Sequence, residues 1–181
     1  MADRVPATIG KYRIERELGR GASGVVYLGL DGLRGRKVAV KQMHAHLLAE
    51  PAQAARHRRQ LQSEAALAAR LRHPNIVRLL DADESATPPY LVFEYLSGRP
   101  LSDHASADTL LPVAQVLDIA FKCGHALEYA ERQGLVHRDI KPANLLLADD
   151  GEVKLVDFRA GLSSQSEATQ LAGLVGSPSY M

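Results

Sequence analysis

HRDIKPAN, residues 137–144, places a carboxylate, an ammonium group and a carboxamide within six positions of one another, on Asp139, Lys141 and Asn144. A carboxylate can orient a hydroxyl group, an ammonium group can neutralise a phosphate, and a carboxamide oxygen can bind a metal ion. Phosphoryl transfer needs these three functions side by side. The stretch therefore predicts a phosphoryl-transfer site.

The composition is that of an ordinary soluble globular protein. The chain has 181 residues, 46% of them hydrophobic, and a formal net charge of +1, so it can bury a core. Because basic and acidic residues are interspersed, neither nucleic acid nor an anionic membrane is expected as the principal partner. The densest basic run, residues 56–59, is interpreted as a solvated helix face.

A cytoplasmic location is expected. The single cysteine, Cys123, cannot form an internal disulfide, which is typical of a reducing compartment. Its apolar surroundings predict a buried small side chain. Residues 1–10 contain charged residues and a proline and lack a continuous apolar run, so no signal peptide is expected. No stretch is long enough to predict a membrane-spanning segment.

After a tail of residues 1–10, residues 11–97 predict a small β-rich lobe. Short runs at 12–18, 25–30 and 37–43 are separated by glycines and predict three antiparallel strands. A helix is expected from Pro51 to Arg72, because this segment is rich in Ala and Arg and has no internal Gly or Pro. His73, Pro74 and Asn75 end it. Apolar runs at 76–80 and 90–95 bring the expectation to five strands and one helix.

Residues 98–181 predict a second, mainly helical lobe, so the expected fold class is α+β. A long helical pattern covers residues 113–133. Two short strands are expected at 145–147 and 153–156, on either side of an Asp-Asp-Gly turn. From Ser163 onward the chain is rich in Ser, Thr, Gly and Ala, which predicts an extended surface segment.

Gly19, Gly21 and Gly24 form the pattern GxGxxG between two strand candidates. Glycines at such positions let backbone amides approach phosphate oxygens, although a tight hairpin also explains them. A dinucleotide-binding fold would begin a helix directly after the glycines, whereas Val25 and the residues after it continue as a strand. The pattern therefore favours a glycine-rich hairpin over a dinucleotide-binding turn.

The segment Val38-Ala39-Val40-Lys41 follows one strand later. The two-residue period of a strand places Ala39 and Lys41 on one face and the valines on the other. A flat ring fits against Ala39 while the Lys41 ammonium group reaches phosphates beyond it. The alternative is an ordinary solvated lysine on an exposed strand.

In the helix that follows, Glu64 shares the helical spacing of apolar residues such as Leu61, Ala65 and Ala68. A carboxylate that faces inward without a partner is costly, on the order of several kcal/mol. Lys41 is therefore the expected partner of Glu64. The alternative is that Glu64 lies at the edge of the stripe and reaches water.

With these elements in this order, the chain resembles the protein kinase family, specifically the bacterial type of Ser/Thr kinase. The resemblance runs from about Tyr12 to Met181 and includes residues 73–77, a hinge-like segment at 93–96 and a closing segment at 176–180. It implies a bilobal kinase fold, with a five-stranded antiparallel N-lobe with its helix and a partial, mainly helical C-lobe. It also implies transfer of the γ-phosphate of Mg-ATP to a Ser or Thr hydroxyl of a protein substrate.

The resemblance implies a role for each matching residue. Asp139 would orient the substrate hydroxyl and Lys141 would contact the γ-phosphate, while Asn144 and Asp157 would bind Mg²⁺. Lys41 and Glu64 would complete the catalytic set, with Phe93 behind the adenine. ATP would be bound by Leu18, Gly19, Gly21, Gly24, Val26, Ala39, Lys41, Glu94, Leu96 and Leu146.

Arg138 would be a buried cation that binds an anion, which in this family is commonly a phosphate on the activation segment. Thr169 is the first candidate for that phosphorylation and Ser166 the second. Unmodified hydroxyl groups are also common in loops.

Two features depart from the family pattern. The expected Asp-Phe-Gly reads Asp157, Phe158 and Arg159 here, which keeps the metal ligand and loses the glycine. A side chain at Arg159 restricts the backbone and places a cation beside the metal site, or it points to solvent and pairs with a phosphorylated loop. The chain also ends at Met181, before the Pro-Glu element and the helices expected to cover the large lobe. A truncated kinase region is therefore expected, with an apolar face exposed.

Two other functions stay open beside the kinase interpretation. A pseudokinase or regulatory fragment, which binds a nucleotide or a partner without turnover, is favoured by Arg159 and opposed by the complete set of catalytic residues. A small-molecule phosphotransferase would share the fold. Lys141 and the segment at 176–180 argue against it, because the resemblance assigns them to a peptide substrate.

Overall fold

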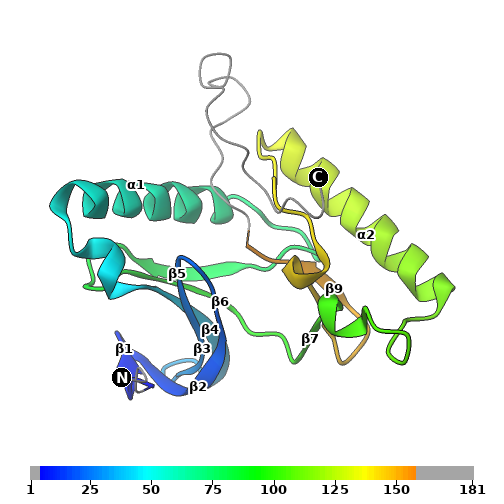
Figure 1. Cartoon of the computed structure of the whole chain (residues 1–181), viewed down its shortest axis with the longest axis horizontal. Coiled ribbons are helices and arrows are strands. Elements are labelled where there is room, and N and C mark those ends of the chain that lie inside the picture. Colours follow the sequence, from blue (N-terminus) through cyan, green and yellow to red (C-terminus); the bar gives the residue numbers. More distant parts are fainter. Residues whose placement is uncertain (1–4, 158–181) are drawn as a thin grey trace. The chain divides into compact units, whose positions relative to one another are not determined.

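The structure is a computed structural model that describes residues 5–157 (Figure 1). The chain divides into two units. Unit 1 consists of Met1–Ala69 and Arg78–Tyr95, and unit 2 consists of Arg70–Val77 and Leu96–Met181. Each unit is described by itself.

Unit 1 is built on one antiparallel sheet with the strand order β1-β2-β3-β4-β6-β5. Its strands are β1 (Thr8–Ile9), β2 (Tyr12–Arg20), β3 (Gly24–Asp31), β4 (Arg36–Met43), β5 (Leu79–Asp83) and β6 (Tyr90–Glu94). The expected strands at 12–18, 25–30, 37–43 and 90–95 are confirmed. The sheet has six strands and not the expected five, because Thr8 and Ile9 in the predicted tail pair with the start of β2.

The expected strand at 76–80 is shifted. The strand begins at Leu79 and pairs antiparallel with β6, whereas Ile76 forms a bridge with Leu155 in unit 2. The apolar run from Ile76 to Leu80 is therefore shared between the two units. The pattern of apolar residues does not show where one role ends and the next begins.

Unit 1 has a smaller hydrophobic cluster that joins Leu61 and Ala65 of its helix to Met43 and Leu91, and a larger core on one face of β3 and β4. The two strands pair without a register shift from Gly24↔Met43 to Asp31↔Arg36. Val38 and Val40 are fully buried in this core, and Ala39 and Lys41 point to the other face and are half-buried. The predicted alternation along β4 is confirmed.

The helix of unit 1 is α1 (Pro51–Ala68), which follows the 3-10 helix η1 (Ala45–Leu48). Proline suits the first helical position, where its missing N–H group would have no helical partner. The helix buries Leu61, Ala65 and Ala68, which belong to the predicted apolar stripe. It ends before the predicted Arg72.

Unit 2 combines one long helix with a three-stranded sheet in the order β7-β8-β9. The elements are α2 (Val113–Arg132), β7 (Gly98–Pro100), β8 (Leu145–Ala148) and β9 (Val153–Leu155), with 3-10 helices η2 (Leu101–His104) and η3 (Pro142–Asn144). The helix and the strands β8 and β9 agree with the predictions to within one residue at each end. Strand β7 was not predicted. Cys123 is buried, as expected.

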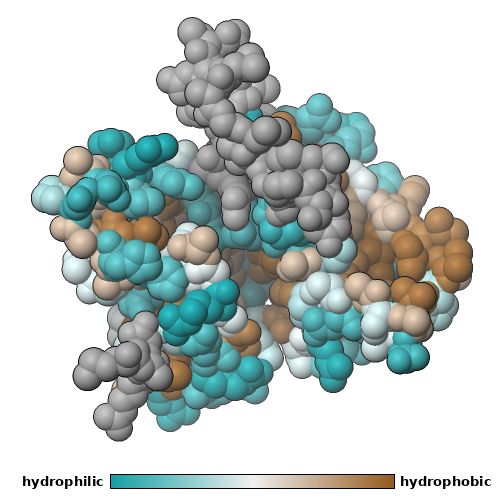
Figure 2. All heavy atoms as spheres, viewed as in Figure 1, coloured by the Kyte–Doolittle hydropathy of each residue, from teal (hydrophilic) through white to brown (hydrophobic). Residues whose placement is uncertain are grey.

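One face of α2 is buried and another is exposed. Ile119, Cys123, Ala126 and Ala130 are buried. Val113, Leu117 and Phe121 expose 76%, 64% and 68% of their surface. Figure 2 shows hydrophobic residues gathered over the N-terminal part of α2, at the right of the view. No helix in the part of the chain that the structure describes is long and apolar enough to cross a membrane.

The segment 70–77 joins unit 2 through β9. The N–H group of Leu155 donates to the carbonyl of Asn75, and that of Val77 donates to the carbonyl of Leu155, both at 2.9 Å. The Asn75 side chain is buried and donates to the carbonyl of Val153 at 2.9 Å. These bonds fix the strand that leads to Asp157.

Candidate phosphoryl-transfer site

The loop 137–144 brings its three polar side chains together. Asp139 is 4% exposed. Its Oδ2 atom lies 2.9 Å from Nζ of Lys141 and accepts a hydrogen bond from Nδ2 of Asn144 at 3.1 Å. The same Nδ2 also donates to the backbone carbonyl of Asp139 at 2.7 Å. The juxtaposition predicted from the spacing is therefore present, and it offsets the cost of burying the carboxylate.

The neutral ring of His137 binds two backbone groups, one directly after β9 and one in the loop. Its Nε2 lies 3.0 Å from the carbonyl of Val156, and its Nδ1 lies 3.3 Å from the N–H group of Asp139. Because a carbonyl oxygen can only accept, Nε2 carries the proton and Nδ1 accepts from Asp139. Burial lowers the pKa of His137, which favours this neutral form. The sequence placed His137 in the motif but gave no sign of Val156 as its partner.

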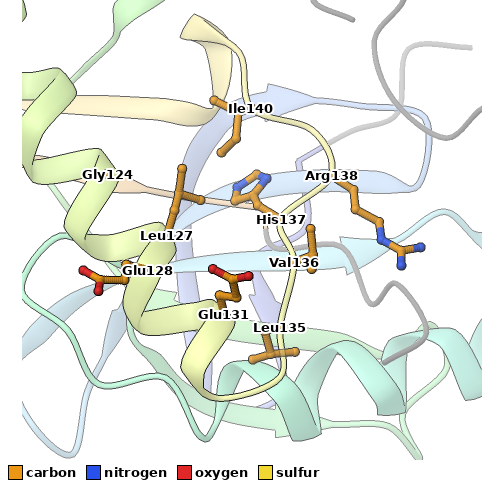
Figure 3. Close-up of a pocket in the computed structure, with 9 residues that line it drawn as sticks. All are labelled: Gly124, Leu127, Glu128, Glu131, Leu135, Val136, His137, Arg138 and Ile140. Atoms are coloured by element: carbon orange, nitrogen blue, oxygen red, sulfur yellow. The ribbon is translucent and has the colours of Figure 1, made fainter. Parts of the chain in front are cut away.

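Arg138 differs from its neighbours in backbone conformation and in the direction of its side chain (Figure 3). Its φ angle is 64°, in the left-handed region that residues with a Cβ rarely adopt. The side chain is half-buried, not buried as expected. Figure 3 shows it on the side of the loop that faces away from α2, while Leu127 and Ile140 line a hollow of about 550 Å³ between α2 and the loop.

Asn144 and Asp157 are connected through one residue. The N–H group of Val156 donates to the carbonyl of Asn144 at 3.0 Å, and the carbonyl of Val156 accepts from His137. Both backbone groups of Val156 are therefore tied to the loop, immediately before Asp157. Asp157 has a φ angle of 62°, again in the left-handed region.

The donor set on Asn144 and Asp157 fits Mg²⁺. The Nδ2 atom of Asn144 is committed to Asp139, which leaves the amide oxygen as the atom able to bind a cation. Asp157 supplies a carboxylate, which is an oxygen ligand. Mg²⁺ prefers such oxygen ligands and is commonly bound by one or two protein groups together with phosphates and water.

In unit 1, Lys41 and Glu64 form the predicted ion pair. Nζ of Lys41 lies 2.9 Å from Oε1 of Glu64, and the two side chains are 19% and 14% exposed. Glu64 reaches this position because it lies on α1 beside the buried Leu61 and Ala65. Lys41 is therefore not a solvated lysine on an exposed strand, and Glu64 does not extend into water at the edge of the apolar stripe.

The three loop glycines have different reasons to be glycine. A Cβ on Gly24 would overlap the backbone carbonyl of Gln42 in the neighbouring strand. A Cβ on Gly19 or Gly21 would meet no heavy atom within 4 Å, and neither residue has a positive φ angle. The packing of unit 1 therefore requires Gly24 but gives no reason for Gly19 and Gly21. An open approach to a ligand would supply that reason.

His44 fastens the tip of the glycine loop, which the sequence did not indicate. Its N–H group donates to the carbonyl of Ser23 at 3.2 Å, and its Nε2 lies 2.8 Å from the carbonyl of Gly21. The N–H group of Gly21 donates to the carbonyl of Gly24 at 2.9 Å. Both His44 contacts are made to backbone carbonyls more than twenty residues away in the sequence. The pattern of side chains along the sequence cannot indicate such contacts.

The residues proposed for ATP occupy both units. Leu18, Val26, Ala39 and Glu94 lie on β2, β3, β4 and β6 of unit 1, and all four are half-buried. Leu96 and Leu146 belong to unit 2, Leu146 on β8. The hinge-like residues Glu94 and Leu96 thus fall on either side of the boundary between the units.

Several predicted features lie outside the described residues. They are Arg159, the phosphorylation candidates Ser166 and Thr169, and the segment 176–180.

Comparison with known proteins agrees with this geometry. The protein kinase domain family matches residues 12–181. A probable serine/threonine-protein kinase of Streptomyces coelicolor is 40% identical over 179 residues, which cover 95% of this chain and 26% of the relative. The serine/threonine-protein kinase PknB of Mycobacterium leprae is 34% identical over 182 residues, which cover 97% of this chain and 29% of the relative.

Solved structures show the same fold. A crystal structure of the Mycobacterium tuberculosis PknI kinase domain superposes with a TM-score of 0.71 at 34% identity. The match covers 86% of this chain and 61% of that domain. The chain therefore spans less than two thirds of the proteins that it matches. With a family match over nearly all of its residues, and with a kinase-like fold, the chain belongs to the protein kinase family.

Proposed function

We propose that this chain is the catalytic region of a Ser/Thr protein kinase, which transfers the γ-phosphate of Mg-ATP to a Ser or Thr hydroxyl of a protein. The observation that carries the proposal is the buried Asp139 carboxylate with Lys141 and Asn144 bonded to it. Relatives named as serine/threonine-protein kinases support it. Because the chain spans 26% and 29% of those relatives, the substrate of the whole protein is part of the proposal.

Asp139 would orient the substrate hydroxyl for attack and accept its proton. The hydroxyl oxygen forms a bond to the γ-phosphorus while the bond to the β-γ bridging oxygen breaks, and ADP leaves. Lys141 would hold the γ-phosphate, and its contact with Asp139 already places a cation next to the base.

Lys41, held by Glu64, would bind the α- and β-phosphates of ATP. The contact with Oε1 of Glu64 fixes the position of the Lys41 ammonium group. Asn144 and Asp157 would hold Mg²⁺, which supplies charge neutralisation on the phosphates when bound. Leu18, Val26, Ala39 and Leu146 would contact adenine, Gly19, Gly21 and Gly24 would lie over the phosphates, and the backbone of Glu94 and Leu96 would bind the adenine edge.

A pseudokinase is the second candidate function. The replacement of the usual glycine by Arg159, two positions after the proposed metal ligand Asp157, favours it. Such a protein would bind ATP through the same residues and would transfer no phosphate.

Phosphate transfer from γ-labelled ATP separates the two functions. The variant Asp139→Asn should lose transfer by a factor of about 10²–10⁴, the usual contribution of a positioned acid-base group. Asp108→Asn is the matched control, because Asp108 is exposed, and it should keep the activity of the parent. Equal transfer by the parent and by Asp139→Asn would refute the assignment of Asp139.

Nucleotide binding completes that experiment. If the parent binds ATP but transfers no phosphate, and Arg159→Gly gains transfer, the natural chain is a pseudokinase. If neither the parent nor Arg159→Gly binds ATP, the kinase and the nucleotide-binding pseudokinase are both refuted, and a fragment that binds only a partner is left.

A further inference from the structure

We infer that Arg58 is a positioning residue that fastens α1 to the turn between β5 and β6 and so keeps Glu64 within reach of Lys41. Its effect on catalysis rests on the proposed kinase function, whereas its effect on α1 does not. Arg58 touches neither member of the ion pair and would act through the helix.

The N-terminal half of α1 needs such a fastening. The helix buries only Leu61, Ala65 and Ala68, and none of its residues from 51 to 60 is buried. One leucine and two alanines remove little apolar surface from water, and all three lie in the C-terminal half. Hydrophobic packing therefore holds one end of α1 and leaves the other end to polar contacts.

Arg58 supplies these contacts in unit 1. Its Nη1 donates to the carbonyls of Glu84 at 2.7 Å and of Ala86 at 3.2 Å. Its Nη2 donates to Oγ1 of Thr87 at 3.3 Å. The planar guanidinium group has donors in a fixed arrangement, so it binds several acceptors of one turn at the same time.

The basic run of residues 56–59 is not uniformly exposed to solvent. Residues 56–59 were expected to form a solvated helix face, and Arg56 and Arg59 are indeed exposed. Arg58 is half-buried and bound to the turn. Neighbouring arginines with the same charge therefore have different environments on one helix, which makes Arg59 a matched control.

The turn that receives Arg58 is itself held in place. Oδ1 of Asp83 accepts hydrogen bonds from the N–H group of Ser85 at 3.1 Å, from the Ser85 hydroxyl at 2.7 Å and from the N–H group of Ala86 at 2.9 Å. Asp83 is the last residue of β5. Arg58 thus connects α1 to the sheet through a turn whose carbonyls are already oriented.

Arg58 and Glu64 restrain the helix at two separate points. Six residues correspond to roughly 9 Å along the axis and to about 240° of rotation. Contacts at two heights and on two sides oppose both tilting and rotation of α1. Without Arg58, only the small contacts of Leu61, Ala65 and Ala68 hold α1. A tilt of its N-terminal half about Leu61 then also shifts Glu64, three residues beyond that contact, relative to Lys41.

Three variants test this inference in the purified protein: Arg58→Gln, Arg58→Lys and the control Arg59→Gln. Arg58→Gln and Arg59→Gln remove the same charge from the same helix. The first measurement is amide hydrogen exchange in residues 51–60, which Arg58→Gln should accelerate and Arg59→Gln should leave unchanged. Arg58→Lys should lie between them, because one ammonium group cannot bind all three acceptors.

The second measurement is steady-state kinetics. For Arg58→Gln we expect a fall in kcat/KM for ATP on the order of tenfold, as for a displaced catalytic group, with KM for the protein substrate unchanged. A uniform loss of active protein would lower the apparent kcat, and kcat/KM with it, but would leave KM for ATP unchanged, so a raised KM for ATP in Arg58→Gln is the discriminating result. Arg59→Gln should match the parent, and Arg58→Lys should recover part of the loss.

The outcomes distinguish this inference from the proposed function. Equal exchange and equal kcat/KM in Arg58→Gln and Arg59→Gln would overturn the role of Arg58. If the parent transfers no phosphate, the kinase proposal fails while the exchange measurement still tests the anchor. If Arg58→Gln does not fold, Thr87→Val removes one acceptor only, and the absence of any change in exchange and in KM for ATP would contradict the inference.

Discussion

His137 shows how a buried side chain orients the backbone of the site. One ring nitrogen donates to Val156 and the other accepts from the backbone of Asp139, so only the neutral ring satisfies both contacts. The ring therefore sets the backbone on which the carboxylate of Asp139 is carried. It also sets the strand end that precedes Asp157.

The neutral state of His137 predicts a dependence of stability on pH. Burial lowers the pKa of His137 in the folded protein, so below about pH 6.5 the unfolded chain binds more protons at this position. The contribution is constant above that pH and lowers the free energy of unfolding as the pH falls below it. Urea unfolding between pH 7.5 and 5.5 should show this acid-side loss.

The variant His137→Gln should have a shallower loss on the acid side, although it is less stable at pH 7.5 because one hydrogen bond is missing. His46→Gln replaces an exposed histidine and serves as the control. Parallel curves for the parent and for His137→Gln would contradict the assignment of the titration to His137.

At the scale of elements, the hairpin of β2 and β3 contains one glycine that the packing requires, Gly24, and two glycines with space for a Cβ, Gly19 and Gly21. Replacing Gly24 by Ala should lower the free energy of unfolding by about 1–3 kcal/mol, because the new Cβ overlaps the carbonyl of Gln42. Replacing Gly21 by Ala should leave stability near that of the parent, because its surroundings are open. Urea unfolding of the two variants measures both effects.

The same pair tests the ligand assignment. Gly21→Ala should raise KM for ATP while the protein stays fully folded, because a Cβ at that position would stand in the approach to the phosphates. If Gly21→Ala had the KM of the parent, the glycine loop would not lie over the phosphates. An unchanged stability of Gly24→Ala would show that β3 and β4 can move apart at no cost.

The elements that the sequence predicted are those with local signals. Val38 and Val40 alternate with Ala39 and Lys41, and burial follows this period. The inward position of Glu64 was visible as a carboxylate within an apolar stripe, and its pairing with Lys41 followed from charge. The loop 137–144 was visible because its polar residues are only a few positions apart.

The elements that the sequence missed depend on distant backbone atoms. Strand β7 contains both a glycine and a proline and exists only through its pairing with β8. The start of β5 is displaced because Ile76 pairs with Leu155. Arg58 and His44 bind carbonyl groups, and every residue carries a carbonyl group, so composition cannot indicate which one is used.

At the scale of the whole molecule, the exposed face of α2 predicts self-association. Val113, Leu117 and Phe121 follow one another at four-residue spacing and are largely exposed. Together they form an apolar strip of the kind that drives association in water. Residues 1–181 alone should therefore form larger species as concentration rises, which sedimentation velocity detects.

The double variant Leu117→Gln and Phe121→Gln should shift those species toward the monomer. Leu33→Gln is the control, because Leu33 is a single exposed leucine in a turn of unit 1. A parent that stays monomeric at every concentration would show that this face of α2 does not drive association.

The bonds between residues 70–77 and β9 also set an order of events during synthesis. All residues of unit 1 have been made once Tyr95 is added. Asn75, by contrast, bonds to Val153, which the ribosome adds 78 residues later. We therefore expect unit 1 to fold first on the ribosome. Residues 70–77 can take their final positions only after β9 has been synthesised.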